Sequence, residues 1–344
     1  MYTIKDYLDY YKDIPFEEQK FNVMDNILFS SLVYLPIENI TNKSITIHEL
    51  AIMYKKEQKT LDASLNYIGK KSVPLLFEII DSTRYKNVLL DNIKSILNSK
   101  VQFFALTFRY NSTAYVAFRG TDNSISGWKE NFTLSYNYPT ETQIEAVNYL
   151  NETITPLDKK IYLGGHSKGG NLAMTCTLEA KEDIYNRIKC VYNNDGPGFL
   201  QNEYQSSKYD KLSKKLYNII PEESVIGILL NNKNYNIVCS VASGVRSHDL
   251  TTWRCFGQFL VQGKLSRFSK LLKERATNWL IETDDKSKAQ IIETFFKVIE
   301  ESGAIHFRDL TKTEIINLVR KSSKVDEKSK QLLLDTLKIF MNIT

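Results

Sequence analysis

Hydrophobic residues follow different periods along the chain, and the changes of period divide it into three regions. Residues 1–98 carry apolar positions at helical spacing, which predicts a mostly helical N-terminal region. Residues 99–256 alternate between strand-like and helix-like segments, and residues 257–344 return to a helical pattern. The N-terminal spacing is clearest in two groups of residues: Phe21, Ile27, Leu28 and Leu32, and then Leu61, Leu65 and Ile68.

The central region predicts a sheet with helices between its strands. Residues 101–110 and 114–118 are rich in β-branched and aromatic residues, and Asn111 and Ser112 predict a hairpin turn between them. Strands alternating with helices favour a mainly parallel sheet covered on both faces. We therefore expect an α/β fold in one domain, residues 1–344, with its core at 99–256. The other expected elements are helices at 141–150 and from Gly169, and strands at 160–163, 188–192, 215–220 and 235–241.

Composition narrows the classes of protein that the chain can represent. Of its 344 residues, 42% are hydrophobic and 25% are charged, as in ordinary globular domains. The net charge of +5 comes from 45 basic and 40 acidic residues that alternate almost throughout, which argues against a nucleic-acid partner. The first twenty residues lack the apolar stretch of a signal peptide. The longest strongly apolar run, 225–230, is too short to span a bilayer.

The four cysteines show no pattern of a disulfide framework or a zinc site. Cys176, Cys190, Cys239 and Cys255 are scattered, with no C-x-x-C pair and no His/Cys spacing typical of zinc. This usage favours a reducing, cytoplasmic setting and no bound metal.

The run Gly165-His166-Ser167-Lys168-Gly169 is the main chemical signal. It has the form G-x-S-x-G, follows an apolar strand-like segment and precedes a helical one. That strand–turn–helix context is the nucleophile elbow of α/β-hydrolases. The sharp turn leaves no room for bulky side chains two positions away, and it lifts the hydroxyl beside a helix N-terminus that favours a developing anion. Ser167 is therefore the expected nucleophile, and we expect an α/β-hydrolase fold.

A nucleophilic serine needs a base, and elimination among four histidines identifies it. His166 adjoins the nucleophile and points elsewhere in an elbow, His48 lies upstream in the helical region, and His306 lies in the helical tail. His248 follows the last strand-like segment, where the chain order serine, acid, histidine places the base.

Two strand ends offer the carboxylate that orients this histidine. Asp195 ends the strand 188–194 and opens a tight turn, and Glu222 and Glu223 follow the next strand. Paired glutamates at a helix start often complement the helix dipole instead, so Asp195 is favoured and Glu223 is the alternative.

The segment "AYVAFRGTDNSISGWKENF" followed by "YLGGHSKGGNLA" resembles the class 3 lipases, which pair an F-R-G-T/S loop with a G-H-S-x-G elbow. A loop of this kind ahead of the nucleophile supplies one oxyanion N–H, and Lys168, the residue after the serine, supplies the other. The resemblance assigns the first role to Thr121. That family usually places its acid just before an I-V-P segment, and Ser224 stands at the corresponding position here, which adds weight to Asp195.

A closer resemblance spans nearly the whole chain. "FNVMDNILFSSLVYLP", "NNDGPGF" at Asp195, "SGVRSHD" at His248 and the helical tail near Trp279 are similar to a family of uncharacterised bacterial lipase-like proteins, for which no substrate is assigned.

These residues predict a serine hydrolase of carboxylic esters, with lipid or other acyl esters as substrates and with no metal or organic cofactor. The same residues also suit a thioesterase, an acyltransferase or a peptidase, and a non-catalytic binding or regulatory protein is the alternative of another class. Residues 264–280 predict an amphipathic helix with a basic face. We expect it to pack on the core, with contact to an anionic membrane surface or a lid over the site as the alternatives.

Overall fold

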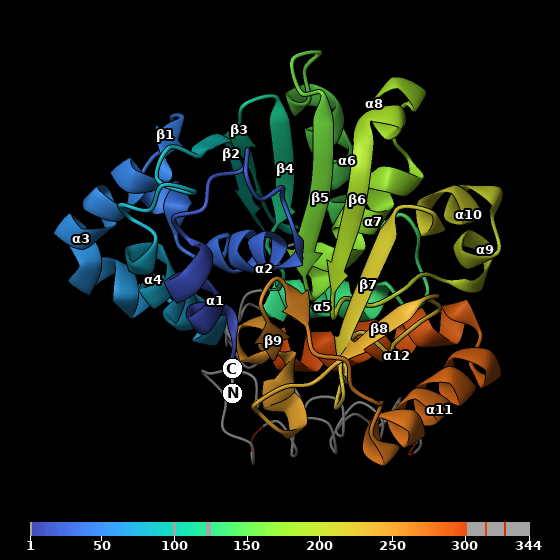
Figure 1. Cartoon of the computed structure of the whole chain (residues 1–344). Coiled ribbons are helices and arrows are strands. Elements are labelled where there is room, and N and C mark those ends of the chain that lie inside the picture. Colours follow the sequence, from blue (N-terminus) through green and yellow to red (C-terminus); the bar gives the residue numbers. More distant parts are fainter. Residues whose placement is uncertain (1, 99–100, 122–124, 301–313, 315–326, 328–344) are drawn as a thin grey trace.

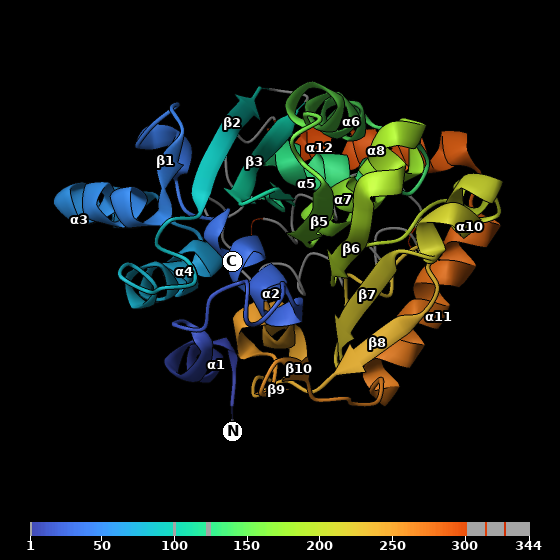
Figure 2. The same ribbon diagram turned by 45° about the horizontal axis from the view of Figure 1, so that its top comes forward.

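A computed structural model gives the fold, and it describes residues 2–98, 101–121, 125–300, 314 and 327. Eight strands form one sheet in the order β1 to β8. Figure 2 shows β1, β2 and β3 on the left of this sheet and β5 to β8 following to the right. Strands β1 to β4 pair antiparallel, and β4 to β8 pair parallel. The strands are β1 (Ile45–Thr46), β2 (Leu89–Leu97), β3 (Gln102–Tyr110), β4 (Thr113–Phe118), β5 (Lys160–His166), β6 (Ile188–Asn194), β7 (Leu216–Pro221) and β8 (Tyr235–Val238).

Helices cover both faces of this sheet (Figure 1). One face carries α1 (Ile4–Tyr11), α2 (Val23–Leu32), α3 (Ile47–Ser64) and α4 (Tyr67–Glu78). The other carries α6 (Glu141–Thr153), α7 (Lys168–Leu178), α8 (Glu182–Arg187) and α10 (Ser207–Ser213). Shorter or peripheral elements are α5 (Ile125–Thr133), α9 (Gln201–Tyr204), β9 (Cys255–Phe256), β10 (Phe259–Leu260), α11 (Arg267–Glu282) and α12 (Asp285–Glu300).

Alternation along the central strands creates two separate cores. On β3, Phe104 and Phe108 face the N-terminal helices, whereas Phe103 and Ala105 face α6 and α7. This period of two is what a strand buried on both faces produces. The eight-stranded, mostly parallel sheet with helices on both sides is the α/β-hydrolase fold, as the sequence predicted.

The N-terminal region is mostly helical, as expected, but it also contains β2, a strand that the sequence pattern did not predict. Its apolar residues Leu89, Leu90, Ile93, Ile96 and Leu97 recur at nearly helical spacing. The pairing with β3 shifts register between Asp91 and Lys94, and Asn92 adopts a positive φ of 53°. A bulge of this kind adds a residue to one strand and breaks the alternation that would have identified it.

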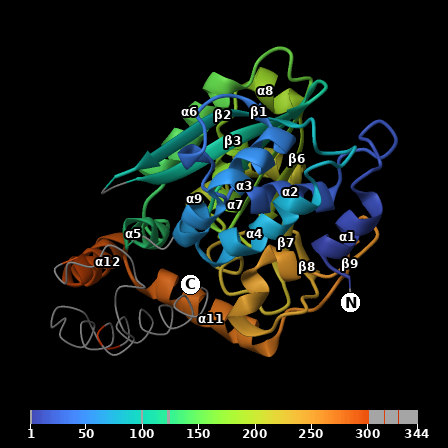
Figure 3. The same ribbon diagram turned by 90° about the vertical axis from the view of Figure 1, so that its left-hand side faces the viewer.

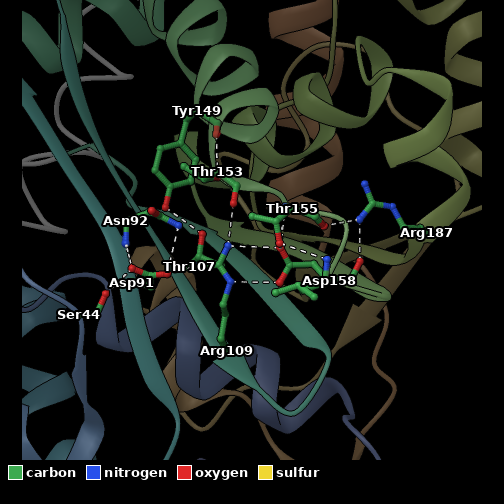
Figure 4. Close-up of polar contacts among 11 residues, drawn as sticks. Ser44, Asp91, Asn92, Thr107, Arg109, Tyr149, Thr153, Thr155, Asp158 and Arg187 are labelled. Atoms are coloured by element: carbon green, nitrogen blue, oxygen red, sulfur yellow. Dashed lines mark hydrogen bonds and ion pairs between the residues drawn. The ribbon is translucent and has the colours of Figure 1, made fainter.

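Polar contacts at the C-terminal end of β3 connect this bulge to the segment just before β5 (Figure 4). The guanidinium of Arg109 binds Asp91 at 2.5 Å and Asp158 at 3.1 Å. It also donates to the carbonyl of Thr153 at 2.8 Å, where α6 ends. These contacts connect the antiparallel strands β2 and β3 to the loop that precedes β5.

Helix α2 is joined to the segment between α4 and β2 by a buried ion pair. Asp25 on α2 accepts two hydrogen bonds from Arg84, at 2.7 and 2.8 Å, and one from the hydroxyl of Tyr85 at 2.6 Å. Both charged side chains are fully buried. Removing one partner of such a pair costs about 3–5 kcal/mol, because the other charge stays buried without compensation. The position of α2 is therefore strongly fixed.

The C-terminal part of the described chain is helical. After the β9–β10 hairpin, α11 covers most of the helix predicted at 264–280, and the predicted helical pattern beyond residue 300 lies outside the described residues, apart from positions 314 and 327. Within the described ranges, none of the helices combines the length and the apolar character needed to cross a lipid bilayer.

Candidate active site

The carboxyl ends of β5, β6 and β7 meet at the lower end of the sheet in Figure 1, and Ser167 lies there between β5 and α7. Its backbone has φ 58° and ψ −129°, a conformation that L-residues rarely adopt. The turn is held by a hydrogen bond from the Ser167 amide to the carbonyl of Asn194, at 3.0 Å, and by one from Gly170 to Ser167, at 2.9 Å.

Close packing explains the two glycines that flank the serine. A Cβ atom at Gly165 would lie 2.4 Å from the backbone of Gly169, and one at Gly169 would lie 2.2 Å from the carbonyl oxygen of Phe118. The helix α7 therefore begins directly against β4 and β5, with Ser167 as its N-cap residue. This is the strand–turn–helix arrangement that the motif predicted.

Asp195 and His248 are hydrogen-bonded to each other in this region. His248 Nδ1 lies 2.6 Å from Asp195 Oδ2, and both side chains are buried. The second carboxylate oxygen, Oδ1, accepts from the hydroxyl of Ser224 at 2.5 Å and from the amide of Gly227 at 3.0 Å. The alternative acid, Glu223, instead accepts a hydrogen bond from the amide of Gly244.

Several contacts bring this pair next to Ser167. The ring of His248 lies 4.2 Å, between centroids, from the ring of His166, the residue before the nucleophile. A Cβ atom on Gly196, the residue after Asp195, would lie 2.3 Å from the Ser167 carbonyl oxygen. The structure therefore gathers the predicted nucleophile, base and favoured acid at one place.

His166 is buried and takes part in a chain of hydrogen bonds that the sequence did not reveal. Its Nε2 lies 2.8 Å from the carbonyl oxygen of His248, which can only accept, so Nε2 carries the proton. Its Nδ1 then accepts from the hydroxyl of Tyr34, at 2.9 Å. Burial lowers the pKa of His166 well below its usual value and keeps the ring neutral, in keeping with this pattern.

Tyr34 extends the chain to the predicted oxyanion loop. Its hydroxyl accepts from the amide of Gly120 at 3.2 Å while it donates to His166. Gly120 itself lies against Ser167, since a Cβ atom there would be 3.2 Å from the Cβ of Ser167. The backbone of the Gly120 loop and that of His248 are thus joined through Tyr34 and His166.

The two predicted oxyanion donors occupy different surroundings. Thr121 follows Gly120, and its hydroxyl exchanges hydrogen bonds with the amide group of Asn131 on α5, at 2.7 and 3.0 Å. Lys168 is the first residue of α7, where backbone N–H groups have no partner within the helix. Lys168 follows Ser167 directly, and Gly120, the residue before Thr121, packs against Ser167.

The side chain of Lys168 has a separate, structural set of partners. Its ammonium is buried and binds Glu130 at 2.9 Å, and Gln102 through the backbone and side-chain oxygens at 2.7 and 2.8 Å. The amide of Gln102 in turn donates to the carbonyl of Gly120 at 3.4 Å. This network braces the oxyanion loop and α5 against the first turn of α7. Its partners are 38 and 66 residues from Lys168, so no local pattern of residues indicates them.

An apolar cluster adjoins these loops and joins them to α12. Its buried residues come from α5, which follows Thr121 in the chain, from the segment that follows Ser224, and from α12. Val245, which precedes His248, is partly buried and packs against this cluster. Helix α12 completes it, side by side with α5 as Figure 3 shows. Ser167 is only 8% exposed and His248 only 4%, so the site is covered. The buried members are Ile125, Trp128, Val225, Ile226, Ile291, Ile292, Phe295, Phe296 and Ile299.

In the part of the chain that is described, the cysteines form no disulfide, and the cysteines and acidic side chains form no metal-binding site. Cys176, Cys190, Cys239 and Cys255 are all free thiols. Across residues 2–98, 101–121 and 125–300, no group of three or more His, Cys, Asp or Glu side chains is arranged to hold a metal ion.

The chain is similar to known proteins at the level of a family and of a solved structure. Among solved structures, the chain is similar to the crystal structure of M37 lipase, with 16% identity, a TM-score of 0.34, and coverage of 73% of this chain and 79% of that one. No curated protein matches the chain. The model of the Mbeg1-like family matches residues 79–297, which include β2 to β10, α11 and most of α12. This match covers more than half of the sequence, and the chain therefore belongs to the Mbeg1-like family.

Proposed function

We propose that the protein is a serine hydrolase that cleaves carboxylic esters, with lipids or other acyl esters as its substrates. One observation carries the proposal: a serine in a strained turn at a helix N-terminus lies beside a buried His248–Asp195 pair. A strained backbone of this kind costs about 1–3 kcal/mol and persists at functional sites because the surrounding packing imposes it. The membership in a lipase-like family and the α/β-hydrolase fold agree with this reaction class.

In this mechanism His248 acts as the base and Asp195 holds it in one tautomer. Because Asp195 accepts at Nδ1, Nδ1 carries the proton and Nε2 is left to take the proton of Ser167. The serine oxygen attacks the ester carbonyl, and the resulting imidazolium is stabilised by the carboxylate. Ser224 and Gly227 hold the other carboxylate oxygen, so the acid stays oriented toward the ring.

Charge on the tetrahedral intermediate would be bound by the N–H groups of Thr121 and Lys168. His248 then protonates the departing alkoxide, which leaves as an alcohol and gives the acyl-enzyme on Ser167. Water, deprotonated by the same histidine, attacks the acyl-enzyme and releases the carboxylic acid. The serine regains its proton, and the cycle requires no further reactant.

The apolar cluster of α5 and α12 supports a substrate with an acyl chain. Its members Ile125, Val225 and Ile226 follow the oxyanion loop and flank the residues that bind Asp195. Pockets that bind apolar ligands are lined mainly by hydrophobic and aromatic side chains, with a few polar groups that fix orientation. In the proposed complex, the part of the acyl chain next to the ester carbonyl would contact these apolar side chains first.

The nucleophile assignment is tested by covalent labelling. A fluorophosphonate probe is expected to label the native protein, and Ser167→Ala is expected to abolish labelling, because only an activated serine attacks phosphorus at a useful rate. Labelling is read by in-gel fluorescence and by mass of the modified peptide. Ser243→Ala, at an exposed serine near His248, is the matched control and should label normally. Equal labelling of Ser167→Ala would refute the assignment.

The substrate class is tested by activity against p-nitrophenyl esters of increasing acyl length. If an acyl chain contacts the apolar cluster, kcat/KM should rise with chain length by up to about fourfold per CH₂ group that becomes buried, from about 0.8 kcal/mol each. Equal rates from acetyl to long acyl esters would contradict the lipid substrate but leave the hydrolase chemistry standing. Faster cleavage of the matching thioesters would point to the thioesterase alternative.

The choice of acid is tested by two isosteric substitutions. Asp195→Asn should lower kcat by about 10⁴-fold with little change in KM, because the amide favours the wrong tautomer of His248. Glu223→Gln should leave kcat nearly unchanged, since the carboxylate contacts the Gly244 amide and not the histidine ring. Steady-state kinetics on one ester decide the matter. The opposite ranking of the two variants would assign the role to Glu223.

The chain through Tyr34 predicts an effect from a residue of the N-terminal region. Tyr34→Phe leaves the Gly120 amide and His166 Nδ1 without their partner, which should cost about 1–3 kcal/mol of unfolding free energy and lower kcat more than it changes KM. Tyr54→Phe is the control, because it removes a hydroxyl bonded to Asp62 at 2.8 Å, away from the site. Urea denaturation and steady-state kinetics are the measurements. If both variants lose stability and neither loses kcat, Tyr34 has no role in positioning the site.

A further inference from the structure

The segment of residues 254–282, which holds the β9–β10 hairpin and α11, exposes an unusual share of large hydrophobic side chains. Among the described residues, twelve such side chains are exposed, and five of them lie in this segment. All three exposed phenylalanines, Phe256, Phe259 and Phe268, are among the five. Scattered apolar residues are normal on a surface, whereas a concentration in one segment indicates an interaction site.

The hairpin holds two of these rings in a fixed position. Phe256 pairs with Phe259 across a two-residue turn, and Gly257 in that turn has a φ of +55°. The neighbouring side chains Cys255 and Leu260 point inward and are 4% and 6% exposed, whereas Phe256 is 75% and Phe259 67% exposed. Because side chains alternate along a strand, both rings stand on the outer face of the hairpin.

Helix α11, which follows the hairpin in the chain, also exposes apolar and basic groups. Ser269 and Trp279 are buried and mark the face that packs on the protein. Phe268 and Leu271 are 52% and 46% exposed. The exposed basic residues of the helix are Arg267, Lys270 and Arg275.

Positive charge is concentrated in the same segment. Residues 254–282 contain six basic and two acidic residues, a net charge of +4 out of +5 for the whole chain. The remaining residues are therefore almost neutral in sum. The basic residues are Arg254, Lys264, Arg267, Lys270, Lys273 and Arg275.

The surface also lies at the end of the molecule that holds Ser167. Figure 1 shows β9 and α11 at the lower end, toward which the arrows of β5 to β7 point. A partner bound to this surface would therefore lie on the same side as the site.

We propose that the 254–282 surface binds the face of a lipid bilayer that contains anionic lipids. Phenyl rings on a hairpin tip and on an amphipathic helix enter the boundary between headgroups and acyl chains, and lysine and arginine bind the anionic headgroups. A second copy of the chain fits less well, because two surfaces of net charge +4 repel each other. The proposal goes beyond ester hydrolysis and does not depend on the chemistry of Ser167.

Co-sedimentation of the full chain with vesicles tests the proposal. The protein is used as Ser167→Ala, so that lipid hydrolysis cannot alter the vesicles, and the vesicles are phosphatidylcholine alone or phosphatidylcholine with about one third phosphatidylglycerol. Binding to the mixed vesicles is expected to exceed binding to the neutral ones by at least about tenfold, and to fall as salt is added, because screening weakens attraction between surface charges.

Two pairs of substitutions separate the apolar and the basic contributions. Phe256→Ser with Phe259→Ser, and Lys270→Glu with Arg275→Glu, should each lower binding to the mixed vesicles by about tenfold or more. The first control is Leu157→Ser, at a side chain that is 78% exposed just before β5, and hence at the other end of the sheet. The second is Lys181→Glu with Lys214→Glu, which changes net charge equally at exposed positions before β6 and β7. Both controls should bind like the parent, and thermal unfolding confirms that each variant folds.

Three results would overturn the proposal. The first is equal sedimentation with and without vesicles, and the second is a loss of binding in the controls as large as in the hairpin and helix variants. The third is dimerisation in solution that Phe256→Ser with Phe259→Ser abolishes, without vesicle binding by the parent, which would assign the surface to a second copy. Failure of fluorophosphonate labelling would leave the vesicle result unaffected, so the two proposals fail separately.

Discussion

The backbone at Ser167 takes a left-handed conformation that a serine would not adopt by itself, and its surroundings are arranged to impose it. Gly165, Gly169 and the carbonyl of Phe118 pack so closely that a Cβ atom on either glycine would clash with the backbone. The first turn of α7 therefore lies directly against β4 and β5. The amide of Ser167 is fixed to Asn194 at the end of β6. The side chain of Asn194 in turn contacts Asn26 and Ser30 on α2. The strained turn is thus coupled to both neighbouring strands and to the helix on the opposite face.

This coupling gives the N-terminal helices a place in the site and not only in the core. Helix α2 is fixed by the buried Asp25–Arg84 pair, and its residues Asn26 and Ser30 contact the end of β6. Tyr34, just after α2, reaches Gly120 and His166. A shift of α2 would therefore move hydrogen-bond partners of both the oxyanion loop and the residue that holds the His248 backbone. Buried polar groups tolerate such a shift poorly, because each lost hydrogen bond leaves a desolvated group.

The sequence was sufficient for the central fold and for the strand–turn–helix arrangement at Ser167, because these depend on local patterns. Strand periodicity and the two glycines of the elbow are visible over a few residues, and the order of elements follows from them. The strand β2 was missed because its bulge disturbs the period that identifies a strand. Tyr34, Glu130 and Gln102 were missed for another reason, since they contact His166 and Lys168 from 132, 38 and 66 residues away. Contacts of that separation are created only when the sheet forms.

The acid illustrates how a local signal and a distant contact combine. The resemblance to class 3 lipases predicts a carboxylate at position 224, on the segment after β7, where this chain has a serine. Ser224 still faces the same place, but its hydroxyl donates to Asp195, which approaches from the end of β6. A carboxylate at the end of the neighbouring strand can reach the same histidine nitrogen, because adjacent parallel strands end at the same edge of the sheet. In the proposed triad, an acid at the end of β6 instead of β7 therefore keeps a hydrogen bond to His248, and Ser224 supports its carboxylate.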